Sequence, residues 1–312
     1  MRCDFGATGA DASMGARREP TGGDCVMERF SMVYVPLDRN EASKQVIPLA
    51  SALAEAADAT LCFIHAATHN EAATDLLEHL HVTRGQIRNA MFDQFPGRPE
   101  DVIPATVNQH PHSIIVMPMS AHPEGGIQEL GPVSLAVIKK GDCPVVFAPP
   151  GHDWNHWKPK RMLLPQDSTE ECAAAVAPAV GFSSKSKSHL TLLHVPIYSA
   201  GILEPAHHAL PLPRYLDQPQ HAIRAWQEAF IERLCELGHV PEGVELDLVL
   251  GTGDPGEEIL AWAKRIQADL IVLPWHRDLE TADIFRAVIR GAECPIMSLP
   301  IANVIAPSVQ AA

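Results

Sequence analysis

The chain has 312 residues, of which 46% are apolar and 20% charged, so it can bury at least one sizeable core and is not a disordered protein. Its formal net charge of -14 excludes nucleic acid and anionic membranes as expected partners, because both would be repelled. The seven cysteines form no CxxC pair and no zinc-type quartet, which predicts reduced thiols.

The two ends of the sequence are expected to lie outside the fold. Residues 1–28 are rich in Gly, Ala, Asp and Thr and show no apolar periodicity, which predicts a flexible tail, and residues 302–312 form a second tail. No apolar run reaches the length of a membrane helix, and the N-terminus lacks the apolar region of a secretory signal. We therefore expect a cytoplasmic protein.

Five short apolar runs follow the first tail. They predict strands at 32–37, 60–66, 89–95, 113–118 and 144–148. Segments of helical periodicity separate these runs, which favours parallel strands joined by right-handed crossovers. The uninterrupted run at 113–118, SIIVMP, is typical of a strand that is covered on both faces.

The same order of elements recurs after a linker at 150–157. Asp38 and His65 are matched by Asp167 and His194 at an offset of 129, Gly97 is matched by Gly253 at 156, and Ala136 by Ala287 at 151. We interpret these ordered matches as a tandem repeat, with domains at 29–149 and 158–301. The second copy carries an insertion of 27 residues, a Pro-rich segment that is expected to form a surface loop and that leads into a helix. That helix is expected to bury Ile223, Trp226, Phe230 and Leu234 and to stop at Gly238.

Isolated histidines and cysteines have structural explanations. His152, Asp153 and His156 would share a face only in a helix, which the neighbouring Gly151 and Pro159 oppose, so we expect a surface linker and no metal site. His65 and His194 end interior strands, which indicates structural hydrogen bonds.

Cys143 and Cys294 occupy equivalent places in the closing strands and are expected to be small core residues. A redox sensor is the alternative for this pair. No set of nucleophile, base and orienting residue can be recognised from spacing, so we expect no enzyme.

Four motifs together resemble the universal stress protein family: a strand ending V-P-x-D, a second strand ending in His, a G-D-P-x-E-x-I turn, and a closing C-P-V-V strand. The resemblance covers both copies. It implies an α/β fold of two tandem five-stranded parallel-sheet domains, of the adenine-nucleotide α-hydrolase-like, Rossmann type. Domains of this family commonly dimerise through the closing strand. We therefore expect 144–148 to pair with 295–299 as an intramolecular pseudo-dimer, with a homodimer as the alternative.

In family members that bind ATP, the resemblance implies that a loop Gly-x2-Gly-x9-Gly-Ser/Thr after the fourth strand cradles the phosphates. Counting back from Gly131 places Pro118 and Ala121 where the first two glycines belong, and Pro132 replaces the hydroxyl residue. A proline donates no backbone hydrogen bond. The second copy has no glycine between Leu273 and Ile289 and has three acidic residues there instead.

The aspartate after the first strand lies near the adenine and ribose in nucleotide-binding relatives. The candidate ATP site of the first domain thus comprises Pro36, Asp38, Ser120, Gly125, Gly126, Gly131 and Ser134, and in the second domain only Asp167 corresponds. The alternative for both aspartates is a turn or helix-capping role. Asp38 also lies at the carboxyl end of its strand, where open α/β sheets bind ligands.

These observations predict a non-catalytic stress-response protein that acts as a binding or regulatory module, with degenerate nucleotide loops and no bound cofactor. Protein partners, or a small-molecule or nucleotide ligand, are expected. The alternative is an adenine-nucleotide-binding switch or weak ATPase that uses the first domain. A sensor of redox state or of small ligands is a third hypothesis.

Overall fold

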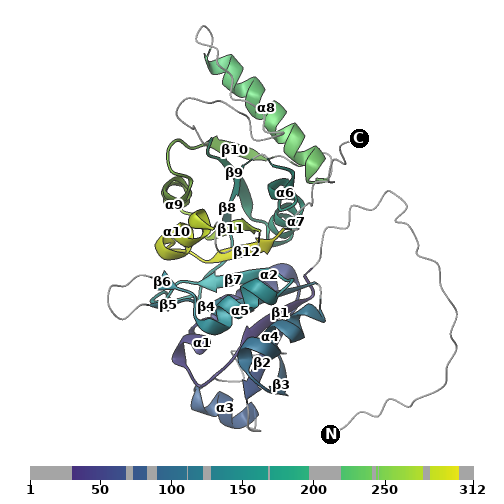
Figure 1. The fold of residues 1–312 in the computed structure, drawn as a ribbon, viewed down its shortest axis with the longest axis vertical. Coiled ribbons are helices and arrows are strands. Elements are labelled where there is room, and N and C mark those ends of the chain that lie inside the picture. Colours follow the sequence, from purple (N-terminus) through teal and green to yellow (C-terminus); the bar gives the residue numbers. More distant parts are fainter. Residues whose placement is uncertain are drawn as a thin grey trace, which may run out of the picture.

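A single continuous sheet organises the chain in the computed structural model (Figure 1). The model describes residues 30–67, 73–82, 90–110, 112–121, 128–167, 169–196, 219–240, 244, 246–276 and 282–301. Both predicted tails and most of the predicted insertion loop lie outside these residues.

The strands fall into two groups along the chain. The first group is β1 (Met32–Pro36), β2 (Thr60–Ala67), β3 (Met91–Pro96), β4 (Ser113–Pro118) and β7 (Val145–Ala148). The second is β8 (Arg161–Gln166), β9 (His189–His194), β10 (Asp247–Leu250), β11 (Leu270–Trp275) and β12 (Ile296–Pro300). Two short strands, β5 (Ser120–Ala121) and β6 (Gln128–Glu129), form a separate antiparallel ribbon. The strands predicted for the first copy agree with β1, β2, β3, β4 and β7 to within two residues, whereas the ribbon was not predicted.

The helices connect these strands as crossovers. In the first half they are α1 (Glu41–Gln45), α2 (Ile47–Ala57), α3 (Ala73–His79), α4 (Pro99–Asn108) and α5 (Pro132–Lys140). In the second half they are α6 (Glu170–Ala173), α7 (Val176–Ser186), α8 (Pro219–Leu237), α9 (Pro255–Arg265) and α10 (Asp283–Gly291). None of the helices described is long and apolar enough to cross a lipid bilayer.

The ten strands are ordered β10-β9-β8-β11-β12-β7-β4-β1-β2-β3. Every neighbouring pair in this sheet is parallel except β7 and β12, which are antiparallel. In that central pair Phe147 lies opposite Ile296 and Val146 opposite Met297. The pairing expected between 144–148 and 295–299 is therefore present, and the two closing strands protect each other's edges.

Two apolar layers cover the two faces of the sheet. Because successive strand residues point to opposite faces, Val33 and Val35 of β1 join one layer, and Tyr34 joins the other. The first layer includes residues of α2, α7 and α8, and the second includes residues of α4, α5, α9 and α10. Both layers run through both halves, so the halves share one continuous core.

A glycine turn of the same kind precedes α4 and α9. Gly97 and Gly253, which match each other in the sequence, have φ angles of +135° and +113°. Residues that have a side chain rarely adopt this backbone conformation, which explains why a glycine stands at both places. Pro99 and Pro255 follow within the first turn of each helix, where a missing N–H costs nothing.

Helix α8 packs against α6 and α7 of the second half. Trp226, Phe230 and Leu234 are buried, as predicted for its apolar face, whereas the side chain of Ile223 lies outside the described residues. Gly238 follows the end of the helix, where a Cβ would meet the carbonyl oxygen of Ala173 at 2.6 Å.

The two matched histidines make equivalent hydrogen bonds. His65 Nδ1 lies 2.8 Å from the carbonyl oxygen of Leu37, and His194 Nδ1 lies 2.8 Å from that of Gln166. The predicted structural role of both is confirmed. Each imidazole ties one strand to the carboxyl end of the neighbouring strand.

The linker at 150–157 contains no helix, so His152 and His156 share no helix face. The linker is not merely a surface segment, which corrects the prediction, because Trp154 is buried and Trp157 Nε1 donates to the carbonyl oxygen of Asp269 at 3.0 Å. Cys143 is buried in the core, as predicted, and Cys294 packs partly buried against the same layer, but both precede their strands.

We predict that Phe147→Ala lowers the free energy of unfolding by about 3–5 kcal/mol, because it opens a cavity at the centre of the shared core. Phe147 is fully buried and lies edge-on to Phe285 of the other half, with ring centroids 6.5 Å apart. Urea denaturation followed by circular dichroism measures the change. Phe95→Ala on the edge strand β3 is the control, where the half-buried ring should cost clearly less. Equal losses would contradict a shared central core.

We predict a pH-dependent stability that involves His194. Burial lowers the pKa of this imidazole below its ordinary value of 6.5, and its ring packs 4.7 Å from that of Phe230. The unfolded chain then binds more protons than the folded one, so stability is present above about pH 6.5 and is lost as the pH falls below it. Melting temperatures of the wild type and His194→Phe should converge or cross between pH 7.5 and about 5.5. A constant difference across this range would count against the proposed protonation effect.

Candidate functional site

Each half of the sheet has a pocket at the carboxyl ends of its parallel strands, the place where open α/β sheets bind ligands. The first pocket, of about 200 Å³, lies beyond β1 and β4. The second pocket, of about 220 Å³, lies beyond β8 and β11. A third cavity of about 290 Å³ adjoins the first pocket and shares Asn40, Ala42 and Pro118 with it.

The first pocket contains four of the seven residues predicted for the nucleotide site. Pro36, Asp38, Gly131 and Ser134 all line it. Ser120 lies in β5, but its side chain lies outside the described residues, as do Gly125 and Gly126. The structure therefore brings β1 and the start of α5 together, as the sequence predicted.

Asp38 holds the turn between β1 and α1. Its Oδ1 accepts a hydrogen bond from Asn40 N at 3.0 Å and a short one from Ser43 Oγ. Asn40 in turn caps α1, since its Oδ1 accepts from Ala42 N at 3.2 Å. This is the turn role that the sequence left open as an alternative. One face of the carboxylate is thus already occupied by the protein's own donors.

The N-terminus of α5 lines the first pocket and is the helix start where nucleotide-binding relatives would hold a phosphate. Gly131 is the N-cap residue and Pro132 occupies the first turn, so the proline contributes no N–H. The N–H group of Leu135 is bound to Gly131 O at 2.9 Å. Val133 and Ser134 therefore carry the backbone donors that face outward from this first turn.

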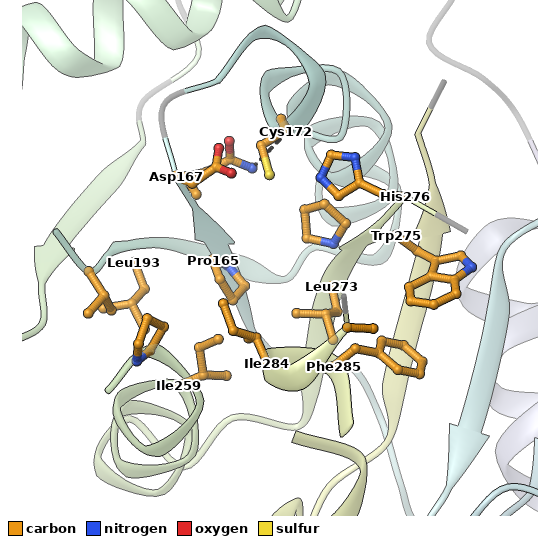
Figure 2. A pocket seen from close by; sticks show the side chains of 15 residues that line it. Pro165, Asp167, Cys172, Leu193, Ile259, Leu273, Trp275, His276, Ile284 and Phe285 are labelled. Atoms are coloured by element: carbon orange, nitrogen blue, oxygen red, sulfur yellow. Dashed lines mark hydrogen bonds between the residues drawn. The ribbon is translucent and has the colours of Figure 1, made fainter. Parts of the chain in front are cut away.

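The second pocket is mostly apolar with polar groups at one end (Figure 2). Its walls include Leu193 of β9, Ile259 of α9, Leu273 of β11 and Phe285 of α10. At its polar end lie Asp167, Cys172 and His276 (Figure 2). Such a pocket suits a small ligand with a large apolar part better than a polyanion.

Asp167 repeats the turn role of Asp38. Its Oδ1 accepts from Thr169 N at 2.9 Å and from Thr169 Oγ1 at 2.7 Å. Thr169 caps α6 by accepting from Cys172 N at 3.2 Å. The same turn therefore fixes the aspartate and orients the first turn of the helix that carries Cys172.

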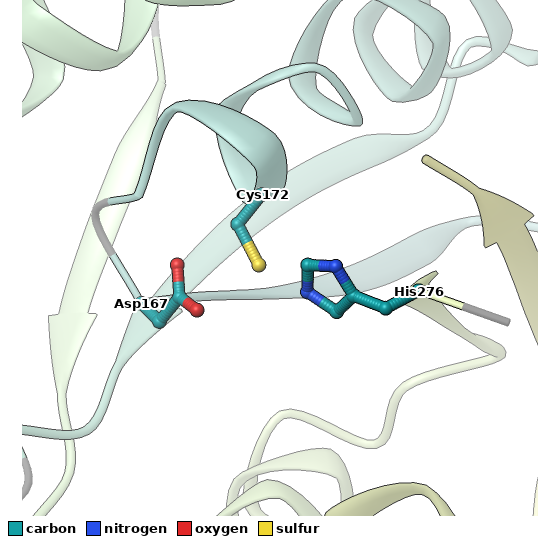
Figure 3. A group of neighbouring side chains, drawn as sticks. All are labelled: Asp167, Cys172 and His276. Carbon is teal, nitrogen blue, oxygen red and sulfur yellow. The ribbon is translucent and has the colours of Figure 1, made fainter. Parts of the chain in front are cut away.

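The side chains of Asp167, Cys172 and His276 point toward one another (Figure 3). One oxygen, the sulfur and one ring nitrogen all lie within 4.8 Å of each other. Burial raises the pKa of the Cys172 thiol, and the neighbouring Asp167 carboxylate raises it further. The thiol is therefore protonated near neutral pH and is a poor nucleophile, which disfavours catalysis of the cysteine–histidine type.

Sequence reasoning singled out Asp167 but did not join it to the other two residues. The repeat offsets contained the necessary signal. At an offset of 129 Cys172 corresponds to Ser43, and at an offset of 156 His276 corresponds to Ser120. Because β8 and β11 are neighbouring strands, the residues after them meet at one edge of the sheet.

The start of α10 differs from that of α5. Asp283 occupies the first position of α10, and its carboxylate pairs with Arg286 at 2.8 Å. A negative side chain at this place already interacts favourably with the positive end of the helix. It would repel a phosphate at the same position.

Trp275 connects the second pocket to the first half. It lines the second pocket, its ring lies 4.5 Å from that of Phe285, and its Nε1 donates to the carbonyl oxygen of Ile138 at 3.2 Å. Ile138 belongs to α5, whose N-terminus lines the first pocket. The walls of the two pockets therefore meet through one helix and one indole.

Comparison with known proteins places part of this architecture in a family. Residues 158–300 match the universal stress protein family model, and among curated proteins none matches the sequence. A universal stress protein from Archaeoglobus fulgidus DSM 4304 has a similar structure, with a TM-score of 0.58 and 16% identity over 88% of this chain and 98% of that one. A functionally unknown protein from Pseudomonas aeruginosa PAO1 gives a TM-score of 0.59 at 13% identity, over 89% and 95% of the two chains. Residues 158–300 therefore form a domain of the universal stress protein family.

Proposed function

We propose that the whole chain is a tandem universal stress protein, with one domain at 29–149 and a second at 158–301. Read from the outer edge to the central pair, the strand orders are β3-β2-β1-β4-β7 and β10-β9-β8-β11-β12. These orders support the proposal, because corresponding strands of the two halves occupy the same places. The antiparallel pair β7–β12 then corresponds to the edge contact of a pseudo-dimer. The similar length and fold of the Archaeoglobus protein are consistent with two domains in one chain.

The proposed role is that of a non-catalytic, cytoplasmic binding or regulatory module in a stress response. Its ligands would be small molecules that bind at the carboxyl ends of the strands. Its protein partners would distinguish the ligand-bound from the ligand-free form. The protonated Cys172 thiol supports a non-catalytic role, because the second pocket then has no activated nucleophile among its described residues.

The observation that carries the proposal is the first turn of the helix beside each pocket. Pro132 removes a donor from α5, and Asp283 adds a negative charge to α10. Backbone N–H groups and a positive helix end are what hold a phosphate chain in place. We therefore propose that neither domain binds adenine nucleotides tightly and that both phosphate loops are degenerate.

We predict that ATP, ADP and AMP at millimolar concentration leave the melting temperature of the purified protein unchanged. A ligand at 100 times its dissociation constant would add about 2.7 kcal/mol to the free energy of unfolding, which a thermal-shift assay detects easily. Denaturation of the purified protein should release no adenine nucleotide that mass spectrometry can detect. A shift that is present in the wild type and lost in Asp38→Ala would contradict the proposal.

The second candidate function is an adenine-nucleotide switch or weak ATPase that uses the first domain with ATP as its ligand. The convergence of Pro36, Asp38, Gly131 and Ser134 on one pocket favours it. The first pocket alone is smaller than the range of about 300–1,000 Å³ typical of ligand sites, but the adjoining cavity of about 290 Å³ extends it past Asn40 toward the linker.

We predict that Pro132→Ser strengthens the response to ATP. The substitution restores a backbone N–H at the start of α5 and the hydroxyl expected after Gly131 in nucleotide-binding relatives. One added hydrogen bond to a charged phosphate contributes about 1.5–3 kcal/mol, which corresponds to roughly tenfold or more in affinity. Isothermal titration with ATP measures the gain, and Ala282→Ser, which adds a hydroxyl at the N-cap of α10, is the control in the second half. Equal affinities of the wild type and Pro132→Ser would show that the proline is not what weakens the site.

A further inference from the structure

We propose that Asp167, Cys172 and His276 form a binding site for Zn²⁺ at the polar end of the second pocket (Figure 3). Their ligand atoms lie within 4.8 Å of one another and come from three segments of the second half. This inference goes beyond the proposed function, and no nucleotide takes part in it. A Cys172 thiolate that is held by zinc is not a free nucleophile, which agrees with the proposed non-catalytic role.

The three ligand types match the preferences of zinc. Thiolate sulfur, imidazole nitrogen and carboxylate oxygen are its usual protein ligands, and sites that exchange a fourth ligand keep three protein ligands. A hard cation such as Mg²⁺ or Ca²⁺ would need a set of oxygen ligands instead. A set with one sulfur and one nitrogen among three ligands therefore selects a borderline-soft transition ion.

The supporting segments allow the small closure that binding requires. Ligand atoms around tetrahedral zinc lie about 3.5 Å apart, so the three groups must approach by about 1 Å. Cys172 is buried in α6, whereas Asp167 and His276 are both exposed and follow the ends of β8 and β11. The exposed His276 side chain can therefore move toward the sulfur, whereas Thr169 holds Asp167 beside it.

Hydrogen bonds to Thr169 hold two of the three proposed ligands in place. Thr169 donates through both its N–H and its hydroxyl to Oδ1 of Asp167, and its hydroxyl accepts from Cys172 N. One residue thereby positions two of the three ligands. Groups that hold ligands in this way commonly change metal affinity by 10–100-fold when they are removed.

The first half provides an internal comparison. By the repeat offsets, its equivalents of the three ligands are Asp38, Ser43 and Ser120. The carboxylate is kept, but hydroxyls replace the thiol and the imidazole. Asp38 and Ser43 simply hydrogen-bond to each other, so the turn is stable without a thiol or an imidazole. A structural need of the turn therefore does not explain the presence of cysteine and histidine in the second half.

Zinc binding would change the charge balance of the site. The ion displaces the thiol proton, which is released to solvent, and the resulting thiolate is held by the metal. The fourth coordination position would then face the second pocket, whose walls are formed by Ile259, Leu273 and Phe285. Water or the polar group of a small ligand can complete the coordination there.

The test is a titration of the full-length, metal-stripped protein with Co²⁺, a spectroscopic substitute for Zn²⁺. We expect one equivalent to produce a thiolate-to-cobalt charge-transfer band, and Zn²⁺ to abolish that band by displacement. Cys172→Ser should lose the band entirely. His276→Ala, which removes an exposed side chain and should not affect folding, should weaken Co²⁺ binding by tenfold or more.

Cys235→Ser is the matched control, because Cys235 is a half-buried thiol on α8 that belongs neither to the three-residue cluster nor to the lining of the second pocket. This variant should keep the band and the affinity of the wild type. The proposal is overturned if no band forms, if the band persists in Cys172→Ser, or if His276→Ala binds Co²⁺ as tightly as the wild type. Nucleotide titrations of the same proteins report separately on the proposed function.

Discussion

The antiparallel contact between β7 and β12 is the constraint on which the rest of the structure depends. A parallel half-sheet ends in a strand with unpaired backbone groups, and here each half supplies the missing neighbour of the other. Both apolar layers continue across this contact, with Val146 and Met297 in one and Phe147 and Ile296 in the other. Because the strand direction reverses at this point, the carboxyl ends of the two halves, and the two pockets with them, lie at opposite edges of one sheet.

The reversal also explains how the walls of the two pockets come into contact. Helix α5 begins at the first pocket and runs back toward the other edge, where Ile138 receives the hydrogen bond of Trp275 from the wall of the second pocket. Helix α10 begins at the second pocket and lies against β6 of the first half. Each pocket is therefore built partly on a helix that also contacts the other half.

Much of this fold follows from the sequence, because strand and helix periodicities are local properties. The strands of the first half, the buried face of α8 and the hydrogen bonds of His65 and His194 were predictable from apolar patterns and matched positions. The β5–β6 ribbon was missed, since strands of two residues have no periodicity to detect. The cluster of Asp167, Cys172 and His276 was missed for a different reason. Its members meet only because β8 and β11 are neighbours, and strand order is a property of the whole sheet.

Both halves contain the same turn after their first strand, but different side chains lie beside its aspartate. We propose that this difference determines what each half can bind. In the first half Asp38 accepts from Ser43, and a helix lacking one donor lies across the pocket. In the second half the equivalent aspartate faces a thiol and an imidazole, while Asp283 places a fixed negative charge at the start of α10. A phosphate would meet repulsion there, whereas a cation would meet a carboxylate and a thiol that can lose its proton. The residue proposed to exclude a phosphate and the residues proposed to bind a transition metal are therefore different, and both sets belong to the second half.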